Sequence, residues 1–242
     1  MPMRSRFTQV ALASVLFLSA IALHSQKQGA SSPSAAVFAA EIAQPSQSVS
    51  ANKQHALVAL TLMQTAAWME AGWHPGIATD DLYKIQFTGS KFSSYADHPN
   101  EVRCASTAYG ELCSAASGAY QFMPDTWHGI YARYDYWPVG ANGEKFIPAA
   151  QDLAFLRLFA ETGGWWHLES GIQVLGGIVT VKEESIANAL NAAAATWCSF
   201  PSHTPAARGE PGPYSCNNPR QPQKDMGAAI EMFNENLKRN QS

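Results

Sequence analysis

The chain has 242 residues, and its 46% hydrophobic and 11% aromatic content is enough for a packed core in one large domain or two small ones. Sixteen lysines and arginines against nineteen aspartates and glutamates give a formal net charge of −3. Because no basic patch and no run of like charge occurs, nucleic acid is not expected as a partner, and an anionic target would have to be recognised by a shaped groove.

The first residues, 1–24, are predicted to be an export signal. Arg4 and Arg6 precede an apolar stretch at 10–23, which is the pattern of a secretory signal peptide. The stretch is short for a membrane span, but an uncleaved signal anchor remains the alternative and would be the chain's expected contact with a membrane. Both interpretations place the protein outside the cytoplasm, in the periplasm or secreted.

A segment of low complexity follows at 25–52. It consists mainly of Ser, Ala, Gln and Pro with few charges, a composition typical of a disordered linker. The rest of the chain contains no internal repeat, so residues 53–242 are predicted to form one folded domain.

The folded part begins with a predicted helix at 55–69, which is apolar almost all round and is therefore expected to be buried on most sides. Gly72 is well placed to end it. Residues 83–95 then alternate apolar and polar side chains around a Thr-Gly-Ser turn. This pattern predicts a β-hairpin, with Asp80 and Asp81 capping its entry.

Four cysteines in an exported chain indicate two disulfides. Their spacing favours two local pairs, Cys198–Cys216 and Cys104–Cys113, the latter clasping a second hairpin or loop at 101–116. A zinc site is the alternative, but neither C-x-x-C nor H-E-x-x-H spacing occurs. We therefore expect no metal, and nothing in the sequence indicates a cofactor.

The sequence SGAYQFMPDTW at 117–127 allows two interpretations. Its first three residues are small enough for another group to approach the backbone closely, and Pro124 suits the first turn of a helix. The plain interpretation is a loop that leads into a helix and places Tyr120 and Phe122 in the core. The other is a cleft wall, with rings on which a sugar face rests and the Gln121 amide for its acetamido groups.

Helices are predicted for most of the remaining chain, at 124–134, 149–161, 186–197 and 225–237. A loop rich in Pro and Gly at 200–223 separates the last two. One helix, a small sheet and then a helical bundle make an α+β order, and clefts commonly open between two such lobes.

Glu70 is the first candidate for catalysis. It lies at the C-terminal end of the apolar helix, with Trp68, Met69 and Trp73 close in sequence. The carbonyl end of a helix and an apolar wall both disfavour negative charge, so both favour the protonated carboxyl that a proton donor needs at neutral pH. The alternative is a solvated glutamate at a frayed helix end.

Cleavage of a glycosidic bond usually requires a second carboxylate about 5–9 Å from the first. Asp97, in the sequence SYADHP after the predicted hairpin, is the best partner by position. A structural role in a side-chain turn competes with that function and is the role we favour. No G-x-S-x-G, P-loop or G-x-G-x-x-G motif points to another chemistry.

Five segments occur in order from about residue 55 to the C-terminus: AAWMEAG, YKIQFTGSKFSSYADHP, SAASGAYQFMPDTW, WCSFP and GPYS. Together they resemble the lambda-type phage endolysins, lysozyme-like enzymes of the glycoside hydrolase class. The YQFMPDTW stretch is also similar to the G-x-x-Q-x-M-P-x-T element of soluble lytic transglycosylases. The resemblance implies an α+β, lysozyme-like fold that is mainly helical, with a small antiparallel β-hairpin region forming one side of a glycan cleft.

The resemblance also implies roles for individual residues. Glu70 would be the catalytic acid. The residues expected to bind the glycan are Tyr95, Ser117, Tyr120, Gln121 and Tyr214. Three features depart from the family: Ala119 stands where the family commonly has Arg, the cysteine-bearing segments are extra, and an export signal is unlike a cytosolic endolysin.

We therefore expect a monomeric enzyme that acts on the glycan strands of peptidoglycan, at the β-1,4 bond between N-acetylmuramic acid and N-acetylglucosamine. With Glu70 as the one catalytic carboxyl, the expected reaction is that of a lytic transglycosylase, which leaves 1,6-anhydromuramoyl ends. The alternatives are a hydrolysing muramidase that uses Asp97 as second carboxylate, a chitin-directed enzyme, and a wall-binding domain without turnover.

Overall fold

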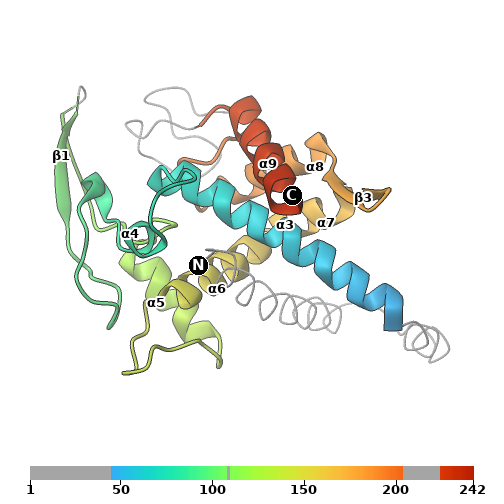
Figure 1. Cartoon of the computed structure of the whole chain (residues 1–242). Helices are drawn as coiled ribbons and strands as arrows, with labels where there is room; N and C mark the ends of the chain where they lie inside the picture. Colours follow the sequence, from blue (N-terminus) through green and yellow to red (C-terminus); the bar gives the residue numbers. More distant parts are fainter. Residues whose placement is uncertain (1–44, 108–109, 204–223) are drawn as a thin grey trace, which may run out of the picture.

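The computed structural model describes residues 45–107, 110–203 and 224–242, so the predicted signal at 1–24 and most of the predicted linker lie outside the described residues. Within these ranges the chain is mainly helical, with two small antiparallel hairpins, as Figure 1 shows. None of the helices found there is long and apolar enough to cross a membrane.

The longest element is helix α3, Pro45–Ala71, which crosses the molecule in Figure 1. The helix predicted at 55–69 is confirmed, and so is its burial; the buried apolar residues are Ala56, Val58, Ala59, Leu62, Met63, Ala66, Ala67 and Met69. Helix α3 also includes residues 45–52, the end of the predicted linker; Ser, Gln and Ala carry small helix penalties. Gly72, with φ +67°, lies directly after the helix, as predicted.

The C-terminal helix α9, Met226–Gln241, packs along α3. Asn236 donates a side-chain hydrogen bond to the hydroxyl of Thr65 (3.3 Å) in the interface between the two helices. Asp225 caps α9 by accepting the N–H of Ala228 (2.9 Å). These contacts fix the chain just before α9 close to the C-terminal half of α3.

The other predicted helices are confirmed with shifted ends. They are α5, Pro124–Arg133, α6, Pro148–Glu161, and α8, Glu183–Ala193. The sequence did not reveal helix α7, Gly164–Gly171, or the hairpin of β3, Ile172–Leu175, and β4, Ile178–Val181. Gly176 and Gly177, with φ +59° and +81°, form the two-residue turn of that hairpin, where glycine adopts positive φ without strain.

The hairpin predicted at 83–95 is present only as one antiparallel bridge, between Ile85 and Lys91, and no strands form there. Its first residue ends the short helix α4, Thr79–Tyr83, and an isolated β-bridge and the 3-10 turn η2, Phe87–Gly89, follow. Asp80 and Asp81 lie in the first turn of α4 rather than at a strand entry. Carboxylates in the first turn interact favourably with the N-terminal end of a helix. This interaction favours a helix at the point where the sequence pattern had predicted the start of a strand.

The second predicted hairpin is confirmed. Strands β1, Arg103–Thr107, and β2, Gly110–Ser114, pair antiparallel, and Cys104 faces Cys113 across them. These two cysteines form the predicted disulfide. Figure 1 shows this hairpin at one end of the molecule and the β3–β4 hairpin at the other.

Candidate active site

Glu70 is the next-to-last residue of α3 and is only partly exposed. The hydroxyl of Ser199 donates a hydrogen bond to its Oε1. Burial raises the pKa of Glu70 to about 7, while the hydrogen bond from Ser199 and the positive charge of Lys224 act in the opposite direction. At neutral pH the carboxyl is therefore present in both protonation states, as an acid that later serves as a base requires.

Ser199 owes its position to the WCSFP sequence that follows α8. Trp197 and Phe200 are buried, and their rings stack with centres 5.4 Å apart. The indole of Trp197 also donates to the backbone carbonyl of Tyr120 (3.2 Å). Two buried rings therefore hold Ser199 against Glu70 and join WCSFP to the segment that contains Tyr120.

Two residues of the sequence predictions, the disulfide partner Cys216 and the glycan-binding Tyr214, lie outside the described residues. Cys198 is disulfide-bonded, but its predicted partner Cys216 falls in the undescribed range. Tyr214, predicted to bind the glycan, falls there as well.

The segment SGAYQF folds back on itself, since Ser117 and Phe122 exchange two backbone hydrogen bonds (3.0 and 2.9 Å). Tyr120 is buried, stacks on Phe155 with ring centres 4.4 Å apart, and donates its hydroxyl to Asp152 (2.6 Å). Ser117 is fully buried as well. The prediction that Tyr120 and Ser117 line an open groove is therefore wrong. A tyrosine hydroxyl in a core needs a hydrogen-bond partner, and the Asp152 carboxylate supplies it.

Asp152 is a second buried carboxyl close to this region. It also accepts the hydroxyl of Tyr83 (2.6 Å) and so joins α4, SGAYQF and α6. Burial raises the pKa of Asp152 to about 6, against the two hydroxyl donors that lower it. Because the side chain is enclosed by protein, its role is structural, whereas the side chain of Glu70 keeps some exposure.

Gly118 serves packing against α6. Its φ is +83°, and a Cβ at this position would lie 2.1 Å from Gln151 Oε1 and 3.1 Å from the ring of Phe146. The same Gln151 oxygen accepts the backbone N–H of Ala119 (3.0 Å). The small residues at 118 and 119 therefore leave room for the Gln151 side chain. The sequence had indicated that a glycan approaches the backbone there.

Gln121 keeps a partly exposed side chain. Its backbone is left-handed, with φ +47°, a conformation that is uncommon outside glycine and concentrated at functional sites. Its Nε2 donates to the carbonyls of Ile85 and Gly118 (3.2 and 2.9 Å), which fixes the plane of the amide. Because both Nε2 donors are used, a ligand would be bound through Oε1, as an acceptor.

Tyr95, also predicted to bind the glycan, lies beside α4. Its hydroxyl donates to Asp80 Oδ1 (2.9 Å), and the amino group of Lys84 lies 5.0 Å from its ring centre. Burial and the neighbouring Asp80 carboxylate both raise the pKa of Tyr95. The hydroxyl is therefore already bonded within the protein, and the ring is the part that remains for contact with a sugar.

Asp97 is held in a network of its own. Its Oδ1 accepts the N–H of His98 (2.8 Å) and the indole N–H of Trp127 (3.0 Å), and Lys145 Nζ lies 3.5 Å from Oδ2. Burial alone would raise the pKa of Asp97, but these hydrogen bonds and the charge of Lys145 bring it below its ordinary value. The contacts support the structural role in a turn over that of a second catalytic carboxylate.

One group of potential metal ligands occurs among the described residues, Cys104, Glu111 and Cys113. Its two sulfur atoms are joined in the disulfide and are not thiolates. This group therefore does not hold a metal ion while the disulfide is intact.

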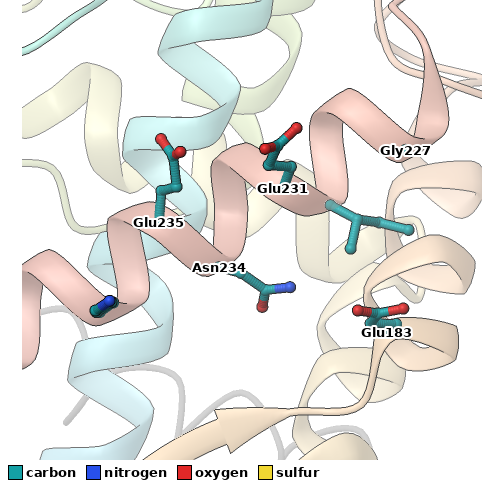
Figure 2. Close-up of a pocket in the computed structure, with 7 residues that line it drawn as sticks. Glu183, Gly227, Glu231, Asn234 and Glu235 are labelled. Atoms are coloured by element: carbon teal, nitrogen blue, oxygen red, sulfur yellow. The ribbon is translucent and has the colours of Figure 1, made fainter.

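A hollow of about 450 Å³ lies elsewhere, between α9 and the first residue of α8 (Figure 2). Its lining residues are Glu183, Gly227, Ile230, Glu231, Asn234, Glu235 and Lys238. Neither Ser199 nor Lys224, the described residues that act on Glu70, lines it. The hollow is therefore separate from the candidate active site.

The sequence did not point to Ser199 or Lys224. WCSFP contributed only to the family resemblance, although a small hydroxyl residue between two aromatic residues is a signal that could have identified Ser199 as a held polar group. Lys224 offers no comparable signal, because a long loop at 200–223 separates it from Ser199 in the chain.

Comparison with known proteins supports the architecture. A family model described as Endolysin matches residues 60–212, more than half of the chain. A solved structure of bacteriophage lambda lysozyme, complexed with a chitohexasaccharide, aligns with a TM-score of 0.52 over 74% of this chain and 94% of that chain, at 18% sequence identity. The comparison with curated proteins gives no match. At this identity the structural likeness shows a lambda-lysozyme-like fold, mainly helical with small antiparallel hairpins.

Proposed function

The chain belongs to the endolysin family, and from this premise we propose that it cleaves the glycan strands of peptidoglycan at the β-1,4 bond between N-acetylmuramic acid and N-acetylglucosamine. The reaction is that of a lytic transglycosylase, which leaves 1,6-anhydromuramoyl ends. The protein acts as a monomer and without a cofactor.

The observation that carries this proposal is the environment of Glu70. A partly buried carboxyl at the end of α3 accepts the hydroxyl of Ser199, and burial raises its pKa to about 7. A proton donor near neutral pH needs such a carboxyl. Asp97, the best candidate for a second carboxylate, is bonded to His98 and Trp127, so one carboxyl has to serve both steps.

In the first step Glu70 gives its proton to the bridging oxygen as the bond from that oxygen to C1 of the muramoyl residue breaks. In the second step the C6 hydroxyl of the same residue attacks C1, and its proton passes to the Glu70 carboxylate. The ring closes as the 1,6-anhydro product and Glu70 is again protonated, with no water consumed. One residue is thus general acid and then general base.

Recognition of the sugar is assigned to Gln121 and Tyr95. Gln121 Oε1 accepts a hydrogen bond from an acetamido N–H or a hydroxyl, and the ring of Tyr95 contacts a sugar face. The complex of bacteriophage lambda lysozyme with a chitohexasaccharide supports this assignment, because that oligomer carries an acetamido group on every sugar.

The same complex favours one further candidate, a chitin-directed enzyme on this fold. Two functions compete with these: a muramidase that hydrolyses the bond with Asp97, and a domain that binds the wall without turnover. Mass analysis of the products separates all of them.

We expect purified protein to release muropeptides from peptidoglycan whose masses are lower by one water than those of the hydrolysed products. Muropeptides at the hydrolysed mass would identify a muramidase instead. Faster cleavage of chitin oligomers than of peptidoglycan would identify chitin as the substrate. Binding to peptidoglycan with no release of muropeptides would identify a wall-binding domain without turnover.

We also propose that the enzyme works after export, in the periplasm or secreted. The signal-like pattern at 1–24 supports this location. The disulfide Cys104–Cys113 supports it independently, because disulfides persist in oxidising compartments and are rare in the cytosol.

A further inference from the structure

Three contacts connect the end of α3 with the chain on both sides of the loop at 200–223. The hydroxyl of Ser199 donates to Glu70 Oε1. The backbone N–H of Lys224 donates to the carbonyl of Ser199 (2.9 Å). The amino group of Lys224 lies 4.9 Å from the ring centre of Trp68, which is two residues before Glu70 on α3.

We propose that Ser199 and Lys224 are positioning residues for the proposed glycan cleavage: Ser199 sets the orientation of the Glu70 carboxyl, and Lys224 stabilises the carboxylate that remains after the proton has been given away. The proposal rests on the proposed function, in which Glu70 is acid and then base. It assigns a role to two residues that neither the sequence motifs nor the family match single out.

The orientation of the carboxyl follows from the hydrogen bond to Ser199. With Oε1 occupied by the serine hydroxyl, Oε2 is the oxygen that carries the proton toward the glycan. Ser199 is buried, and the stacked rings of its neighbours Trp197 and Phe200 fix its segment, so its hydroxyl has little freedom to leave this geometry. A fixed donor oxygen is what proton transfer to one particular glycosidic oxygen requires.

Lys224 is placed to act by charge. Its backbone is held by Ser199, and its amino group lies over the face of Trp68, an arrangement that attracts a cation. No direct ion pair between Lys224 and Glu70 is present among the described residues, but the positive charge acts on the glutamate. The carboxylate is therefore stabilised once formed, without a tight pair that would keep it from taking the second proton.

The two residues also act on the pKa of Glu70. Lys224 is the charged group among the described residues whose field acts on Glu70, and Ser199 is the hydrogen-bond donor. Both lower the pKa of Glu70, against the larger effect of burial. Removing either residue should therefore raise the pKa of Glu70 and move the loss of activity to higher pH. The maximal rate should also fall, because the variant at Ser199 loses the orientation of the carboxyl and the variant at Lys224 loses the stabilisation of the carboxylate.

The test compares Ser199→Ala and Lys224→Met with the conservative variants Ser199→Thr and Lys224→Arg. Ser170→Ala on α7 and Lys238→Met on α9 are matched controls away from Glu70. The rate of muropeptide release is measured from pH 5 to 9, and the carboxyl of Glu70 is titrated by ¹³C NMR, which needs no turnover. We expect Ser199→Ala and Lys224→Met to lower the maximal rate roughly ten- to a hundredfold and to move both titrations to higher pH.

The conservative variants should recover most of the rate, and the controls should match the wild type. If Ser199→Ala and Lys224→Met lower the melting temperature and the rate but leave the NMR titration of Glu70 unmoved, the residues are merely structural and the proposal is overturned. Failure of the proposed function is distinguishable: a wild type that releases no muropeptides removes the catalytic role, while the NMR titration still decides whether Ser199 and Lys224 act on Glu70.

Discussion

Glu70→Gln should lower the rate of muropeptide release by roughly 10²- to 10⁴-fold, the range that general acid and base catalysis contributes. Glutamine keeps the shape of the side chain, and its carbonyl oxygen can still accept the hydroxyl of Ser199. It has no proton to give to the glycosidic oxygen, so the loss falls on the chemical step. The measurement is the initial rate of release from purified peptidoglycan at pH 6 to 7.

The control for this variant is its stability. The pKa of Glu70 is raised in the folded protein, so the carboxyl weakens folding as pH rises from its ordinary value toward about 7. Glu70→Gln lacks this effect and should melt at or above the wild-type temperature at pH 7 and higher. A folded variant that keeps more than about a tenth of the wild-type rate would remove Glu70 from its role, because the loss of a general acid lowers the rate by more than that.

Phe122→Ala should destabilise the fold by about 3–5 kcal/mol, the usual result of emptying a buried phenylalanine site. Phe122 is buried beside Trp127 and Tyr120, with ring centres 5.9 and 6.0 Å away. Activity should fall only as the protein unfolds, so the rate per folded molecule stays near that of the wild type. Thermal melting followed by circular dichroism, together with the rate below the melting temperature, measures both.

The neighbouring variant Gln121→Ala should behave in the opposite way. Its rate should fall by an amount equivalent to about 1–3 kcal/mol, because a desolvated sugar group loses its acceptor. The two hydrogen bonds from Nε2 to Ile85 and Gly118 add a cost in stability of about 1 kcal/mol, smaller than that of Phe122→Ala. If Gln121→Ala melts as low as Phe122→Ala and keeps its rate per folded molecule, SGAYQF is a loop-to-helix junction and nothing more.

The parts of the fold that could be predicted from sequence depend on local signals. An apolar stretch of fifteen residues at 55–69 is long enough to be recognised as a buried helix, and the sequence separation of 9 between Cys104 and Cys113 favours a local disulfide. The alternation at 83–95 predicted strands where only one antiparallel bridge forms, because period two over a few residues occurs in short helices and turns as well. Tyr83 is held by Asp152, which lies 69 residues further along the chain.

The candidate site divides in the same way. Glu70 was recognisable because the apolar residues around it in the sequence predict burial, and burial is what raises its pKa. Tyr120 was not, because an aromatic residue suits a core as well as a cleft, and the partner that decides between them, Asp152, belongs to α6. Ser199 and Lys224 are far from Glu70 in the sequence and come close to it only when the chain folds, so no motif or residue spacing could have predicted them.

The measurement that tests the central claim most directly is the pH dependence of the wild-type cleavage rate. The claim is that Glu70 supplies the proton, and the carboxyl must be protonated to do so. Since its pKa is raised to about 7, the rate should be high below that pH and fall through about pH 7 as one proton is lost. A rate that has already fallen near pH 4 to 5, about where an unperturbed glutamate titrates, or one that rises through pH 7, would contradict the account.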